Sequence, residues 1–224
     1  MLIKKIVSAI LSLSLVFMVS GCHSDKDNPL HGKDTDERIV MCLENAYPEH
    51  NFKVVKSFDK QKNEGLFEDE NGISFKVRDL IYNNTYHFGC RDEYLSTILK
   101  NENFFEKAEK VVEEKYGQKL VHSENTMSID IIYDDNNQIT TDEISQLVQE
   151  VLNIVNTPKV KYPAEREFST NVVNYYTLPA LGVLQCYIEK NEIGETELFY
   201  FSDKSMEQSV IKEKIDKLYQ SVEE

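Results

Sequence analysis

The order in which helix-like and strand-like segments follow one another is the feature that most constrains this fold. In a first run, apolar residues recur at helical spacing from Thr35 until Pro48 ends the pattern. Asn71-Gly72 is a strong hairpin signal between two short apolar segments. The run is predicted to contain three strands and then two helices, at 52–58, 65–70, 73–79, 92–100 and 104–116.

A second run repeats this order loosely. A strand is predicted over 127–133, and the capping box Thr140-x-x-Glu143 opens the most regular amphipathic helix, which continues to Val155. Strands at 168–176, 181–189 and 195–201 and a last helix after Ser205 complete the run. We therefore expect an α+β fold in which amphipathic helices cover one face of antiparallel sheets, and two helix-βββ-helix halves are one interpretation. In the strand at 73–79, Ser74, Lys76 and Arg78 alternate with apolar residues, which predicts one wet face.

The N-terminus is typical of an export signal. Lys4 and Lys5 precede an almost wholly apolar segment, 6–19, which is shorter than the ~20 residues that a membrane-spanning helix needs. The segment ends in Val19-Ser20-Gly21-Cys22, which resembles the lipobox of bacterial prolipoproteins. The resemblance implies that Cys22 carries a diacylglycerol and becomes the mature N-terminus, so that the chain is anchored on the extracytoplasmic face of the cell membrane.

Four segments follow from these patterns. We expect a signal peptide over 1–21, a flexible polar tether over 22–34, a first α+β half over 35–117 and a second over 118–224. The two halves could form one domain. In element order alone, the helix-plus-three-strand units resemble PepSY-type extracytoplasmic modules.

The charge of the chain limits its partners. Its formal net charge is −14, so nucleic acid and anionic lipid headgroups should be repelled. A basic peptide or protein is the partner that this charge favours, although acidity also simply keeps a domain soluble.

Three cysteines remain beside Cys22. A disulfide could join Cys42 to Cys90, or Cys42, Cys90 and Cys186 could all be buried, reduced thiols.

The chemical motifs are weak. His87 and Cys90 have a spacing that a zinc site can use, but no second pair completes a ligand set. Asp134 and Asn136 match ligand positions of a calcium-binding loop that lacks its required glycine and glutamate. Cys90 or Cys186 could serve as a nucleophile, yet no protease signature surrounds either residue. We therefore assign no catalytic residue, metal or cofactor from the sequence.

Aromatic residues outside regular patterns can mark a binding surface, although such residues more often fill the edge of a core. The candidates lie in two stretches of the chain: Tyr82, Tyr86, Phe88, Tyr175 and Tyr176. Together with the predicted anchor, they favour a binding or interaction module, of the immunity type or an envelope accessory protein, over an enzyme. The alternative interpretation is an envelope hydrolase that uses a thiol or a metal.

Overall fold

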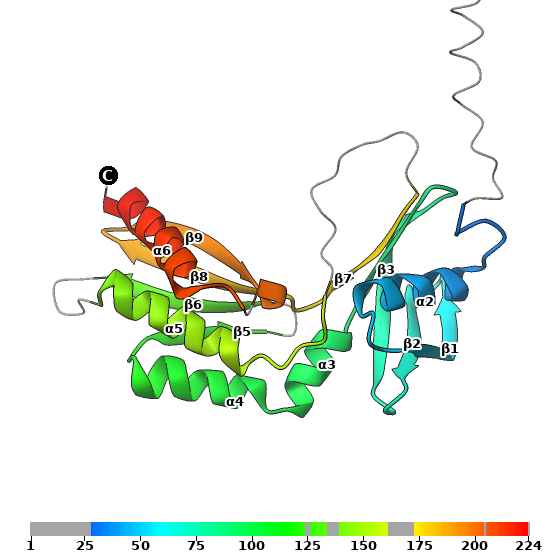
Figure 1. The fold of residues 1–224 in the computed structure, drawn as a ribbon, viewed down its shortest axis with the longest axis horizontal. Helices are drawn as coiled ribbons and strands as arrows, with labels where there is room; N and C mark the ends of the chain where they lie inside the picture. The colour runs from blue at the N-terminus through cyan, green and yellow to red at the C-terminus, as the bar shows by residue number, and fades with distance from the viewer. Residues whose placement is uncertain (1–27, 124–125, 134–138, 161–172, 204, 224) are drawn as a thin grey trace, which may run out of the picture.

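The computed structural model describes residues 28–123, 126–133, 139–160, 173–203 and 205–223, and it confirms the α+β fold (Figure 1). Two mostly antiparallel sheets stand side by side, each with helices against it. The predicted signal peptide, the tether up to residue 27 and most of the strand predicted at 168–176 lie outside the described residues.

Sheet A holds the N-terminal half of the chain and one later strand. Its strand order is β1-β2-β3-β4-β7, and all neighbours are antiparallel except β4 and β7, which are parallel. The strands are β1 (Phe52–Asp59), β2 (Glu64–Asp69), β3 (Ser74–Asn83), β4 (His87–Asp92) and β7 (Asn174–Pro179).

Helix α2 (Thr35–Ala46) covers one face of sheet A. It begins where the sequence predicts, because Asp34 and Glu37 form a reciprocal capping box that satisfies two backbone N–H groups. Its buried stripe packs on inward-facing residues of the sheet, and the side chains that build this layer are Ile39, Cys42, Leu43, Phe67, Phe75, Val77, Phe88 and Cys90. Residues of the intervening positions, Lys76 and Arg78 among them, point to the opposite face, which confirms the alternation predicted for β3.

Sheet B holds most of the second half. Its order is β5-β6-β8-β9, with β6 and β8 parallel, and its strands are β5 (Lys119–His122), β6 (Met127–Tyr133), β8 (Val183–Lys190) and β9 (Ile193–Tyr200). Helices α5 (Thr141–Ile154) and α6 (Gln208–Glu223) lie together against one face of it (Figure 1). A short 3₁₀ turn, η3 (Phe201–Asp203), follows β9. The capping box predicted for α5 is present, since Thr140 and Glu143 bond to each other's backbone N–H.

Three helical segments connect the two sheets. They are α3 (Tyr94–Asn101), α4 (Phe104–Glu109) and η2 (Lys110–Lys115), the last with π-helical hydrogen bonding. One continuous cluster of buried apolar side chains includes residues of both sheets and of the connecting helices.

The strand pairing corrects the prediction in two places. The stretch after residue 79, which local patterns left unassigned, contains the end of β3 and all of β4. β7, which overlaps the strand predicted at 168–176 in the second half, pairs with β4 in sheet A rather than with sheet B. The two halves are therefore not two copies of a helix-βββ-helix unit, because sheet A takes its last strand from the second half.

The end of the predicted tether is held against the domain. Leu30 is fully buried, and the Asn28 side chain donates a hydrogen bond of 2.6 Å to the carbonyl oxygen of Thr85. The Asn28 side-chain oxygen also accepts from the backbone N–H of Leu30 at 2.8 Å. Residues 28–34 are thus part of the folded unit, because burying an apolar side chain and satisfying its flanking polar groups offsets the entropy of ordering them.

Candidate functional site

A groove of about 510 Å³ lies between sheet A and the segments that lead into sheet B. Its floor is formed by the β2–β3 face that points away from α2, and its walls come from α3, α4 and the end of β5. The residues that line it are Leu66, Ser74, Phe75, Lys76, Arg78, Glu93, Ser96, Thr97, Lys100, Phe105, His122 and Ser123. The groove therefore combines apolar, hydroxyl and charged side chains, a composition typical of ligand sites.

The charges in this groove differ from those of the whole chain. Its lining contains Lys76, Arg78 and Lys100 but a single carboxylate, Glu93, whereas the chain carries −14 overall. Arg78 is ion-paired with Glu93, and Lys76 is 3.0 Å from a carboxylate oxygen of Glu64. Lys100 is exposed and has no ion pair among the described residues.

The far wall is built by an aromatic stack. The His122 ring lies parallel to Phe105, with 4.5 Å between centroids, and its Nε2 is 3.1 Å from a Glu109 carboxylate oxygen. These contacts hold the imidazole flat against the phenyl ring, so the wall is apolar with a polar edge.

The five aromatic residues predicted as a binding surface do not form one patch. Phe88 is fully buried beneath α2, and Tyr175 pairs with it across β4 and β7, so it lies on the same side. Tyr82 and Tyr176 share the opposite face of sheet A, with ring centroids 6.3 Å apart, and Tyr86 is half exposed in the β3–β4 connection. The prediction missed that neighbouring residues of one strand point to opposite faces.

Gly89 explains the contact between the two tyrosines. It lies between Tyr82 and Tyr176 in the cross-strand register, and a Cβ atom there would come within 3.1 Å of the Tyr176 ring. The missing side chain lets the Tyr176 ring lie over β4 toward Tyr82, which makes an aromatic strip on the same face of sheet A as the floor of the groove.

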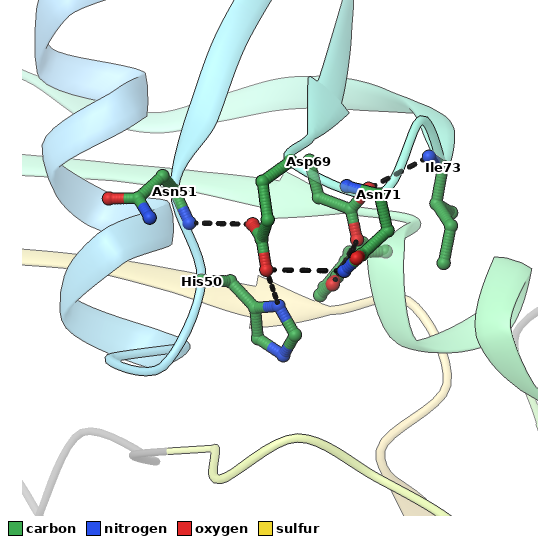
Figure 2. A network of polar contacts seen from close by, with 7 residues as sticks. His50, Asn51, Asp69, Asn71 and Ile73 are labelled. Carbon is green, nitrogen blue, oxygen red and sulfur yellow. Dashed lines mark hydrogen bonds and ion pairs between the residues drawn. The ribbon is translucent and has the colours of Figure 1, made fainter.

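A second polar cluster lies at the turn of the β2–β3 hairpin, and Figure 2 shows its contacts. His50, Asp69 and Glu70 bring one ligand-type atom each within 4.8 Å of one another. His50 Nδ1 is 2.9 Å from Glu70 Oε1, and Glu70 Oε2 accepts from the backbone N–H of Asn51 at 2.9 Å. That backbone hydrogen bond is the largest cause of a lowered pKa of Glu70.

The oxygens of Asp69 are also engaged. Oδ1 accepts from the backbone N–H groups of Asn71 and Ile73, at 2.9 and 2.8 Å, which closes the hairpin turn (Figure 2). Oδ2 accepts from the Tyr94 hydroxyl at 2.8 Å, and burial together with this hydrogen bond raises the pKa of Tyr94. A metal would have to displace several of these bonds, so the arrangement fits a structural lock of the turn better than a metal centre.

The geometry of β4 separates His87 from Cys90, the two residues whose spacing in the sequence suggested a zinc site. His87 and Cys90 are three positions apart in β4, so their side chains point to opposite faces of sheet A. Only Cys90 lies on the α2 side, where it is fully buried, so the two side chains do not share one metal site.

The three described cysteines are free and buried. Cys42 of α2 and Cys90 of β4 contact each other, and burial raises the pKa of the Cys42 thiol. Burial likewise raises the pKa of Cys186 to about 12. A nucleophilic cysteine needs a stabilised, accessible thiolate, and these environments oppose one.

Other predicted sites lie outside the described residues. These are the lipidation site Cys22 and the calcium-like positions Asp134 and Asn136. Within the described part of the chain, no helix has both the length and the apolar character to span a bilayer. Comparison with known proteins finds no matching family model, curated protein or solved structure.

Proposed function

We propose that the protein is a lipid-anchored, extracytoplasmic binding module whose ligand site is the groove between sheet A and α3, α4 and β5. The lipobox-like segment ending at Cys22 supports the anchor. The groove is the observation that carries the binding role, because it is hollow, mixed in polarity and opposite in charge to the rest of the chain.

The module would act as an immunity-type or envelope accessory protein. The acidic remainder of its surface favours basic partners, and the groove is a local exception to that preference. An acidic surface that binds a basic partner and a groove that binds a second ligand would suit an adaptor protein, which contacts two partners at once.

The anchor is tested with Cys22→Ala in the full chain, with Cys186→Ala as a control that also removes one thiol. Metabolic labelling with a fatty acid and membrane fractionation should show labelled, membrane-bound natural chain and Cys186→Ala, and unlabelled, released Cys22→Ala. Labelling that persists in Cys22→Ala would exclude the proposed anchor.

The groove is tested by site-directed photo-crosslinking. Thr97→Cys, on the wall of the groove, and Gln220→Cys, exposed on α6, each provide a thiol for a photoreactive maleimide, while the native described thiols are buried. Irradiation of intact cells should give a discrete adduct from position 97 only. Equal adducts at both positions, or none at 97, would contradict a ligand site in the groove.

A further inference from the structure

We propose that the groove and the adjoining face of sheet A opposite α2 bind an extended acidic peptide segment, whose carboxylates meet the sheet and whose apolar side chains meet the Phe105 wall. This inference rests on the proposed binding function and gives the ligand its chemical class.

The strand register gathers cations on this face. Lys56, Leu66 and Lys76 form one row across β1, β2 and β3, and Arg78 pairs with Arg91 across β3 and β4. Residues directly opposite in antiparallel strands point to the same face, so these side chains share it. The cations extend over about 14 Å, since three steps of ~4.8 Å separate β1 from β4. An extended segment of four or five residues has this length.

In the Arg78–Arg91 pair, Arg91 is the guanidinium without a carboxylate partner among the described residues, while Arg78 lies opposite Glu64. Like charges directly opposite each other in a sheet repel, and Arg78 has the carboxylate of Glu93 as an ion-pair partner while Arg91 has no ion pair among the described residues. A guanidinium matches a carboxylate in a planar, two-bond geometry. A bound carboxylate beside Arg91 would give this guanidinium the kind of partner that Glu93 gives Arg78, which makes Arg91 the expected centre of recognition.

The remaining surroundings favour a peptide over a phosphate-rich polymer or a membrane. The groove has Leu66 on its floor and Phe105 on its wall, and both side chains are half-buried. Ser96 and Thr97 add hydroxyls that can bond a peptide backbone. A flat lipid surface cannot enter a groove of about 510 Å³, and a phosphodiester chain offers no apolar side chain to Phe105.

The aromatic strip continues the same face. Tyr82 and Tyr176 lie in the row through Gly89, two residues along β4 from Arg91. Tyrosine and arginine are enriched at protein-protein contacts, so the strip extends the peptide site beyond the groove.

The acidity of the whole chain does not prevent this binding at physiological salt. The Debye length is about 8 Å at 0.15 M, so distant carboxylates are screened while contacts in the groove persist. The peptide must therefore be recognised locally, by cations that touch it.

The test uses the full chain in a non-ionic detergent and a fluorescein-labelled peptide of alternating Glu and Leu, followed by fluorescence anisotropy. In an extended conformation this probe presents carboxylates to one side and Leu to the other. We expect saturable binding with a Kd below about 1 mM, and no binding of the matched Lys-Leu peptide at the groove. Arg91→Gln and Lys100→Gln should each weaken binding roughly 2- to 5-fold, and together more. Lys217→Gln, an exposed α6 residue with the same charge change, should have no effect.

The outcomes separate this inference from the proposed function. Binding that is insensitive to Arg91→Gln and Lys100→Gln, or displacement of the Glu-Leu probe by unlabelled Lys-Leu peptide as effective as that by unlabelled Glu-Leu peptide, would overturn the acidic-peptide assignment. Stronger competition by inorganic polyphosphate or phosphatidylglycerol vesicles than by unlabelled Glu-Leu peptide would overturn it in favour of phosphate chemistry. Circular dichroism confirms that each variant is folded. Loss of lipid labelling in the natural chain would remove the anchor alone, because the probe binds in detergent either way.

Discussion

Replacing Asp92 by asparagine is expected to preserve stability near neutral pH and to remove one source of its pH dependence. Asp92 ends β4 and is fully buried. Its Oδ1 accepts from the Tyr47 hydroxyl at 2.8 Å and from the backbone N–H of Tyr94 at 2.9 Å, and its Oδ2 accepts from the Thr177 hydroxyl at 2.6 Å. One carboxyl group therefore joins α2, α3 and β7 to β4.

The sign of the pH effect follows from burial. Desolvation raises the pKa of Asp92 in the folded chain, against the opposing effect of the three donors. Between the unfolded value of about 3.9 and the raised value, the folded state binds more protons than the unfolded state. The contribution of Asp92 to the free energy of unfolding is thus largest in acid and falls as the pH rises through this window.

Asparagine keeps the contacts and cannot titrate. Its Oδ1 can accept from Tyr47 and Tyr94, and its amide can donate to the Thr177 oxygen. We expect Asp92→Asn to lie within about 1 kcal/mol of the natural chain at pH 7. Asp92→Ala leaves three buried donors unpaired, each costing about 1–3 kcal/mol, so it should lose at least about 3 kcal/mol.

The assay is urea unfolding between pH 4 and pH 8, followed by circular dichroism because the chain has no tryptophan. Carboxylates with lowered pKa values, such as Glu64 and Glu70, lose stabilisation as the pH falls. They make the free energy of unfolding of both chains increase with rising pH, opposite to the effect of Asp92. The difference between natural chain and Asp92→Asn cancels them and should decrease with rising pH. A flat or increasing difference, or equal damage by Asn and Ala, would refute the reasoning.

Three further predictions concern packing. Leu30→Ala should lower the free energy of unfolding by about 2–5 kcal/mol, because it empties a fully buried site, and urea titration measures this. Gly89→Ala should lower the free energy of unfolding by about 1–3 kcal/mol, because its Cβ would press against the Tyr176 ring. Combining it with Tyr176→Leu should recover part of this loss. A Gly89→Ala variant as stable as the natural chain would contradict the contact. Cys42 and Cys90 should react with a thiol reagent only after urea unfolds the chain, so rapid labelling of the native protein would show that α2 does not cover them.

Local patterns predicted the helices and the hairpin well because their signals are local. The α2 and α5 stripes recur every three or four residues, and both helices open with capping boxes. β4 was not predicted, because Gly89 and the buried Asp92 interrupt the apolar alternation that would indicate a strand. Asp92 is buried only because donors from three other elements reach it, which no local pattern reveals.

The candidate site was only partly predictable. The wet face of β3 was expected from the alternation of Lys76 and Arg78 with apolar residues, and the structure confirms it. The approach of Lys100 and Phe105 to that face depends on how α3 and α4 pack, so it could not be inferred from spacing. The lipid-anchored, extracytoplasmic location implied by Cys22 stays a prediction.

The position of β7 in the sequence, far from the strand with which it pairs, has a consequence for incomplete chains. Sheet A is complete only when Asn174–Pro179 has been synthesised, roughly 80 residues after β4. A chain that lacks this segment leaves β4 as an open edge. An open edge can pair with another chain, so prematurely terminated products that stop before residue 174 should aggregate. A cut at the boundary between the two runs would accordingly yield a fragment that lacks part of its own sheet.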